Sequence, residues 1–203
     1  MAVSKTQPAE RIREAYSAGP RLFGENRVQE FSGKIDALRD LKDAEWHMIG
    51  HLQTNKAAKT AELFLAVDSV DSLKLAEKLD AAARVLGKLD VLIEINVGGE
   101  PAKSGMAPNS AALDQLLTAA PRLGALVFRG LMSVPPLTDD PEVARPYFRK
   151  LRELRDVIAA RKPPSVAMHQ LSMGMSHDFE VAIEEGSTCV RVGTAIFGER
   201  TKP

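Results

Sequence analysis

Lys5 is the residue of this chain with the most direct chemical potential. It follows Ala2–Ser4, which reads as a short strand, and it precedes Pro8, whose fixed φ suits the first turn of a helix. Lys5 is therefore predicted to lie at the C-terminal end of a strand. An amine in that position can condense with an aldehyde, whereas a lysine near a terminus is also a common surface residue. Its position alone leaves both interpretations open.

A second group of chemically capable residues lies near the C-terminus, where two predicted strands end in small residues. Ala167–Leu171 runs into Ser172–Ser176, and Cys189–Val192 runs into Gly193 and Thr194. Small residues let backbone N–H groups approach an anion just before a helix begins. Two such strand ends in succession predict the kind of phosphate site that β/α barrels build after their last two strands.

Arg191 is a charged residue inside the second of these strands. Alternation along a strand places Cys189, Arg191 and Gly193 on one face, opposite Val190 and Val192. If the valines face the outer helices, the guanidinium points into the barrel mouth. It cannot shed its proton there and needs an acceptor. That acceptor could be an inward carboxylate or an atom of a ligand.

The composition limits the possible functions. The 203 residues can bury a full core and contain no linker, so one domain over residues 1–203 is expected. The 27 Lys and Arg residues balance 27 Asp and Glu residues, without a long basic run, which disfavours nucleic acid as a partner. Cys189 is the only cysteine, which excludes an intrachain disulfide and a cysteine-based zinc site. We find no signal sequence and no apolar run that could span a bilayer, so a cytoplasmic protein without a membrane partner is expected.

Eight strand–helix alternations account for the chain. The predicted strands are Ala2–Ser4, Leu22–Gly24, Trp46–Ile49, Phe64–Val67, Leu89–Val97, Leu126–Ser133, Ala167–Leu171 and Cys189–Val192. Strict alternation with short loops implies right-handed crossovers and a parallel sheet, and eight such units close into an α/β fold, a single (β/α)8 barrel of the TIM type. An open doubly wound sheet would need a glycine-rich turn after the first strand, which Ser4–Pro8 is not.

Apolar residues at helical spacing predict the helices between these strands. We expect Asp68–Asp71 to cap a helix whose apolar stripe runs from Leu73 to Leu86. A long helix is expected to begin at Asp140-Pro141, with Val143 on its apolar face.

In such a barrel, the C-terminal ends of all strands share one mouth. Nine residues are predicted at these ends, all of them polar or charged except one glycine. They are Lys5, Asn26, His47, Ser133, His169, Ser176, Arg191, Gly193 and Thr194. His47 and His51 have the spacing of helical zinc ligands, but they fall on a strand and a loop, so no metal site is expected. His169 could equally be a packed core histidine, and His177 a solvated residue at a helix start.

Six motifs follow one another along nearly the whole chain. They are AVSKTQP at 2–8, FGENRVQE at 23–30, WHMIGHLQTNK at 46–56, INVGGEPAKSG at 95–105, LSMGMS at 171–176 with Asp178 shortly after it, and STCVRVGTAIFG at 187–198. Together they resemble the pyridoxal-phosphate homeostasis proteins, single-domain relatives of the N-terminal barrel of alanine racemase. The resemblance implies a barrel of the fold type III class that binds pyridoxal 5'-phosphate (PLP). Family members carry a helical segment ahead of the first strand, so this chain, which starts in that strand, is expected to be truncated or to lack the segment.

The resemblance also implies roles for individual residues. Lys5 corresponds to the lysine that holds PLP as an internal aldimine, Asn26 to a residue flanking the ring, and Arg191 to the partner of the pyridine nitrogen. The phosphate binders correspond to Ser176, Gly193 and Thr194. The function implied is vitamin B6 homeostasis or delivery of PLP to apo PLP-dependent enzymes, by a monomer without robust catalysis.

Two alternatives remain beside that function. One is a PLP-dependent amino-acid racemase. An arginine opposite the pyridine nitrogen makes the ring a weak electron sink, and related racemases supply their second acid/base, a tyrosine, from an additional β domain. Here the only tyrosines, Tyr16 and Tyr147, fall in predicted helices. The other alternative, reached from the residues without the family, is a barrel enzyme acting on a phosphorylated metabolite.

Overall fold

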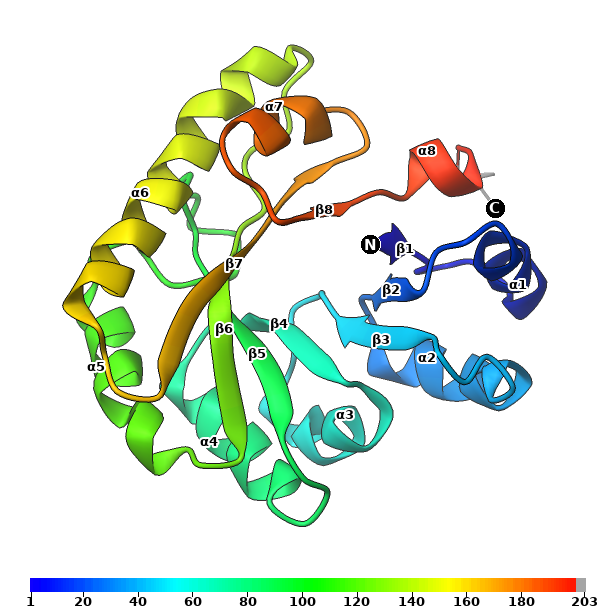
Figure 1. Cartoon of the computed structure of the whole chain (residues 1–203), viewed down its shortest axis with the longest axis horizontal. Coiled ribbons are helices and arrows are strands. Elements are labelled where there is room, and N and C mark those ends of the chain that lie inside the picture. Colours follow the sequence, from blue (N-terminus) through cyan, green and yellow to red (C-terminus); the bar gives the residue numbers. More distant parts are fainter. Residues whose placement is uncertain (200–203) are drawn as a thin grey trace.

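Eight strands, each followed by a helix, form one parallel sheet in chain order in the computed structural model, which describes residues 1–199 (Figure 1). The last four positions of the predicted domain, 200–203, lie outside the described residues. The strands are β1 (Ala2–Val3), β2 (Leu22–Glu25), β3 (Glu45–Met48), β4 (Ala66–Val70), β5 (Leu89–Glu94), β6 (Leu126–Met132), β7 (Val166–Met175) and β8 (Cys189–Arg191).

Hydrogen bonds between the two ends of the sheet join it into a barrel. The backbone N–H of Val3 donates to the carbonyl of Val192 at 2.8 Å, and the N–H of Val192 donates to the carbonyl of Met1 at 3.0 Å. The amino group of Met1 also donates to the carbonyl of Val190 at 3.0 Å. The last strand therefore lies beside the first, and the predicted (β/α)8 barrel is confirmed.

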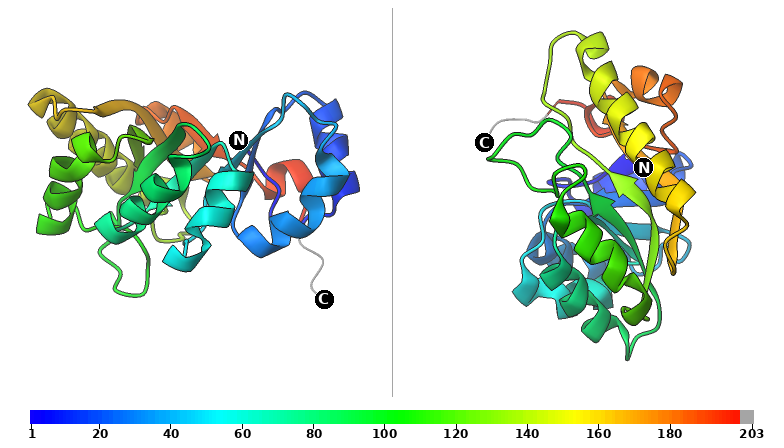
Figure 2. Two further views of the ribbon diagram at one scale, coloured as in Figure 1. Left: turned by 90° about the horizontal axis from the view of Figure 1, so that it is seen from below. Right: turned by 90° about the vertical axis from the view of Figure 1, so that its left-hand side faces the viewer.

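The helices cover the outside of the sheet. They are α1 (Ala9–Ser17), α2 (Val28–Lys34), α3 (Ala57–Leu63), α4 (Leu73–Ala83), α5 (Ala111–Ala119), α6 (Arg145–Arg161), α7 (Phe179–Glu184) and α8 (Thr194–Phe197). Short 3-10 turns span Ile35–Leu38, Thr54–Lys56, Ala120–Arg122 and Pro141–Ala144. Figure 2 shows α1 and α2 at one end of the molecule and α5 and α6 at the other. Within residues 1–199, no helix combines the length and the apolar character that crossing a bilayer requires.

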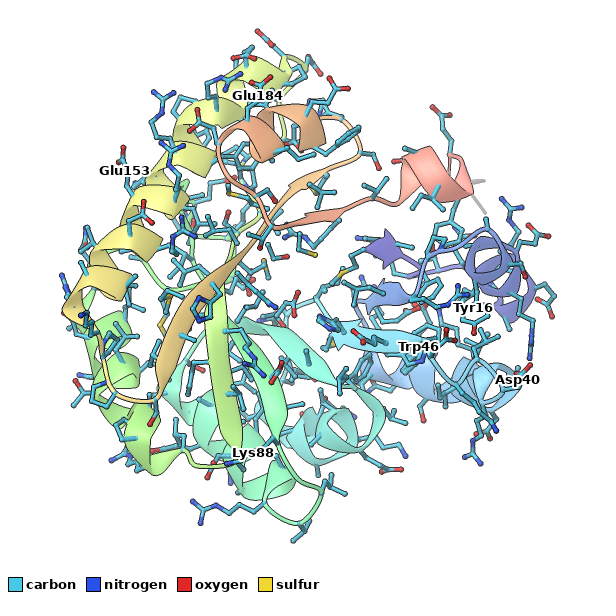
Figure 3. The ribbon with its side chains drawn as sticks, in the orientation of Figure 1. Tyr16, Asp40, Trp46, Lys88, Glu153 and Glu184 are labelled. Carbon is cyan, nitrogen blue, oxygen red and sulfur yellow. The ribbon has the colours of Figure 1, made fainter. Side chains whose placement is uncertain are left out.

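An aromatic cluster packs the early helices against the strands. Trp46 of β3 lies between the sheet and α2 (Figure 3), with its ring centroid 5.0 Å from that of Phe23 and 4.8 Å from that of Phe31. Phe31 in turn lies 4.8 Å from Phe64. These contacts explain the helical spacing of apolar residues in α2, because Phe31 faces the sheet and is fully buried.

The fourth strand was predicted too early in the chain. Phe64 follows α3 as its C-cap, whereas Asp68 lies inside β4 and is buried. The cap of α4 is Ser72, whose Oγ accepts a hydrogen bond from the N–H of Leu75 at 3.3 Å. The prediction that Asp68–Asp71 caps this helix is therefore wrong. An inward aspartate with a partner in the barrel looks the same in sequence as a capping aspartate.

Other boundaries also differ from the prediction. Strand β7 continues to Met175 instead of ending at Leu171, because Ser172 pairs with β6 and Met175 pairs with β8. Leu86 lies beyond the end of α4 and is exposed, so it does not continue the apolar stripe. Val143 is half exposed on the 3-10 turn that precedes α6, and it is not part of the buried face of that helix.

Candidate binding site at the barrel mouth

A cavity of about 390 Å³ lies at the C-terminal ends of the strands. All six residues predicted to bind the cofactor line it: Lys5, Asn26, Ser176, Arg191, Gly193 and Thr194. They follow or end β1, β2, β7 and β8, and the closure of the sheet makes β8 a neighbour of β1. The barrel thus brings together residues from both ends of the chain.

Lys5 enters the cavity from the turn that links β1 to α1. The side chain is half-buried and lines the cavity. The turn is closed by a hydrogen bond from the N–H of Gln7 to the carbonyl of Ser4 at 3.1 Å. Thr6, directly after the lysine, has a φ of 66°, in the left-handed region that residues with a Cβ seldom adopt. The lysine therefore sits on a tight turn whose conformation is under strain.

Arg191 ends β8 and is almost completely buried beneath the cavity. Its Nη1 donates to Oγ of Ser172 at 2.8 Å, and its Nη2 donates to the carbonyl of Ser133 at 2.7 Å. Both acceptors are neutral oxygens. Burial lowers the pKa of the Arg191 guanidinium, and the carboxylates of Asp68, Glu94 and Asp178 oppose that shift from longer range. A guanidinium keeps its proton even so, and its buried charge favours an acceptor in the cavity.

Ser176 joins the two small-residue strand ends. Its Oγ accepts hydrogen bonds from the N–H of Gly193 at 3.1 Å and, more weakly, from the N–H of Ala195 at 3.4 Å. The turn that contains it is fixed by Asp178, which is buried and whose Oδ1 accepts from the N–H of Met175 at 2.6 Å. Backbone donors and a hydroxyl therefore meet at one end of the cavity, an arrangement suited to an anion.

Asn26 follows β2 and contributes an acceptor to the cavity wall. Its Oδ1 is buried and has no hydrogen-bond partner among residues 1–199. The loop after β3 packs closely against it, since a Cβ at Gly50 would lie 2.5 Å from the Asn26 carbonyl oxygen. Buried acceptors are almost always satisfied, so an orphan acceptor on a cavity wall points to a donor supplied by a ligand.

The other residues predicted at strand ends have different surroundings. His47 lies with its Nδ1 3.0 Å from Oδ1 of the buried Asp68, and His169 lies exposed in the first half of β7, away from the mouth. Ser133 offers its carbonyl to Arg191 and is itself fully buried. His51 lies with its Nδ1 3.1 Å from Oδ2 of Asp71. Among residues 1–199, no group of three or more His, Cys, Asp or Glu side chains is placed to hold a metal ion.

Several residues of the cavity wall were not predicted. His177 lines it, although the sequence suggested a solvated turn residue. Apolar side chains also line it: Ile49 after β3, Val134 and Leu137 after β6, and Phe197 at the end of α8. Each lies within a few residues of a strand end, so the rule that pointed to Lys5 and Arg191 would have found them had it been applied to apolar residues.

Comparisons with known sequences agree with this geometry. The family model "Alanine racemase, N-terminal domain" matches residues 1–201. A pyridoxal phosphate homeostasis protein of Aquifex aeolicus is 50% identical over 201 residues, which cover 98% of this chain and 86% of that protein. The pyridoxal phosphate homeostasis protein of Escherichia coli K12 is 44% identical over 203 residues, which cover 98% of this chain and 85% of that protein.

Solved structures with a similar fold include a PLP-bound protein and an alanine racemase. PipY of Synechococcus elongatus, solved with PLP bound, matches with a TM-score of 0.88 at 42% identity, over 98% of this chain and 91% of that one. An alanine racemase of Clostridium difficile shares the fold, with a TM-score of 0.77 at 15% identity over 99% of this chain and 55% of that one. The chain therefore belongs to the alanine racemase N-terminal domain family and, within it, to the pyridoxal phosphate homeostasis proteins.

Proposed function

We propose that this protein binds PLP at the barrel mouth, with Lys5 as the reacting amine, and that it takes part in intracellular PLP homeostasis or delivery without robust catalysis. One observation carries the proposal: a half-buried lysine, a buried arginine and two strand ends suited to an anion meet in a single cavity. PipY, a similar protein at 42% identity, was solved with PLP bound, and the homologues are named for PLP homeostasis.

The residues of the cavity fit each part of that cofactor. When bound, PLP supplies an aldehyde that condenses with a primary amine and releases water. Lys5 is the only lysine on the cavity wall among residues 1–199. Arg191 is suited to an acceptor on the ring, and the orphan Oδ1 of Asn26 to a ligand donor. The phosphate would be held by Ser176, Gly193 and Thr194.

Two features favour a carrier over a racemase. The group expected opposite the ring nitrogen is Arg191, a cation that cannot readily give up a proton, so it does little to increase the electron demand of the ring. Neither tyrosine lines the cavity. Tyr16 of α1, labelled in Figure 3, donates to Asp43 just before β3, and both Tyr16 and Tyr147 of α6 pack against the hydrophobic core. A proton carrier of the kind that two-base racemisation needs is not supplied by these side chains.

An amino-acid racemase remains the second candidate because of one observation. His177 lines the same cavity, and imidazole is the commonest acid–base group in enzymes. If His177 served as the second base, loaded protein would interconvert the two enantiomers of an amino acid, and His177→Ala would abolish that interconversion.

The experiment that tests the carrier function uses the full chain loaded with PLP. The loaded protein should restore activity to an apo PLP-dependent enzyme, and Lys5→Ala should not. In deuterated water, a panel of amino acids should show no useful α-deuteration. Rapid α-deuteration that depends on Lys5 would overturn the carrier proposal in favour of the enzyme.

A further inference from the structure

A group of charged residues, two of them largely buried and the third partly exposed, lies directly behind the turn that carries Lys5. It consists of Glu25 at the end of β2 and of Glu30 and Lys34 on α2. We call these three residues the turn clamp. The side chain of Lys34 is only 11% exposed and that of Glu25 is completely buried. Charges removed from water in this way need specific partners, and their partners here include the main chain on both sides of Lys5.

Lys34 holds the turn at its two ends. Its Nζ donates to the carbonyl of Ser4 at 3.1 Å and to the carbonyl of Gln7 at 3.3 Å. The same ammonium lies 2.8 Å from Oε1 of Glu25 and 3.1 Å from Oε1 of Glu30. One cation therefore ties the residue before Lys5 and the second residue after it to two carboxylates.

Glu25 holds the strand end that precedes the lysine. Its Oε1 accepts a hydrogen bond from Oγ of Ser4 at 2.5 Å, while its Oε2 has no partner among residues 1–199. Burial raises the pKa of Glu25, and the positive charge of Lys34 opposes that rise. Without the ammonium, the carboxylate would be a buried charge with one hydroxyl as its contact, which is strongly unfavourable.

Glu30 holds the strained residue of the turn. Its Oε1 accepts from the N–H of Thr6 at 2.6 Å, and Thr6 is the residue with a φ of 66°. A non-glycine residue persists in that conformation only where its surroundings fix it. Glu30 therefore supplies a contact that keeps the turn in the conformation that directs Lys5 into the cavity.

We propose that the turn clamp positions Lys5. Lys34 does not react with PLP itself, but it contributes to PLP binding by holding the turn that carries Lys5. By fixing the main chain before and after Lys5, the clamp presents the Lys5 amine to the cofactor at a defined place and limits the freedom that would otherwise be lost on binding. This inference rests on the proposed function, because it requires Lys5 to react with PLP. Lys34 itself is not on the cavity wall.

Four variants separate positioning from fold stability. Lys34→Met removes the cation and leaves Glu25 buried and unpaired, so both stability and PLP binding should fall. Glu25→Gln combined with Lys34→Met removes both buried charges, which should restore much of the stability without restoring the bonds from Lys34 to the turn. Lys34→Arg keeps a cation. Lys59→Met is the matched control, since Lys59 forms an exposed pair with Glu62 on α3.

The readouts are the melting temperature of the protein without PLP, the dissociation constant for PLP, and the rate at which borohydride traps PLP on Lys5. The double variant should melt close to the parent yet bind PLP at least tenfold more weakly and react more slowly. Lys34→Arg should regain part of both properties, and Lys59→Met should match the parent. A double variant that binds and reacts like the parent would overturn the clamp and leave the proposed function intact. Failure of the parent protein to bind PLP would overturn both.

Discussion

The phosphate end of the cavity permits a test with a single hydroxyl group. Thr194 begins α8, is exposed, and lines the cavity beside Gly193. Thr194→Val conserves the branched shape of the side chain and removes its hydroxyl. Thr194→Ser is the matched control, because it keeps the hydroxyl and removes a methyl group. If Thr194 binds the phosphate, only the valine variant loses a hydrogen bond to an anion.

The expected loss follows from the contacts at this end of the cavity. A hydrogen bond to a charged group contributes about 1.5–3 kcal/mol, and about 1.4 kcal/mol corresponds to a factor of ten in affinity. The dissociation constant for PLP should therefore rise roughly 10- to 150-fold in Thr194→Val. The loss is confined to one contact, because the Ser176 hydroxyl and the N–H groups of Gly193 and Ala195, which lie 3.1 and 3.4 Å from it, are retained.

The assay compares PLP with pyridoxal, which has the same ring and aldehyde but no phosphate. Both are titrated by visible absorbance into the parent, Thr194→Val and Thr194→Ser proteins. Thr194→Val should bind PLP more weakly and pyridoxal with unchanged affinity. Equal weakening of both ligands would refute the reasoning and place Thr194 away from the phosphate.

Two further predictions concern stability and pH. Burial raises the pKa of Glu94 above its usual 4.5, although Ser104 donates to its Oε1 at 2.8 Å. Its ionised form therefore destabilises the fold above the raised pKa, and Glu94→Gln should melt higher at pH 7 to 8, with the difference shrinking as the pH falls toward 4.5. The hydrogen bond from Arg149, at 2.8 Å, is the main cause that lowers the pKa of Glu185. That carboxylate stabilises the fold above its unfolded pKa of about 4.5 and loses this effect as the pH falls through the lowered value. Glu185→Gln should thus cost about 1–2 kcal/mol in chemical denaturation at pH 7 and progressively less in acid; an undiminished difference at low pH would contradict this.

The barrel and the position of Arg191 could be predicted because both follow from short-range patterns. Alternation of strands and helices implied eight parallel units, and alternation within β8 gave Arg191 a face opposite the valines. The limit of such patterns is visible at Asp68. A carboxylate just after an apolar run looks like a helix cap, and only the folded barrel shows that its partner is His47, 3.0 Å away on the neighbouring strand.

The turn clamp could not have been found from the sequence. Lys34 lies on α2 four residues after Glu30, and such a pair of opposite charges is the usual pattern of a solvated helix face. Its contacts with the Ser4 and Gln7 carbonyls cross about thirty positions and depend on how α2 packs against the end of β1. The resemblance to a known family identified Lys5, but it carried no information about what holds Lys5 in place.

The central claim is that Lys5 is the amine that reacts with PLP at the barrel mouth. The most direct test is to incubate the full chain with PLP, reduce it with borohydride, measure the intact mass and map the modified peptide. We expect one phosphopyridoxyl group per chain, attached to Lys5, and no label in a folded Lys5→Ala variant. A label on another lysine with Lys5 unmodified, or an unmodified parent protein, would contradict the account.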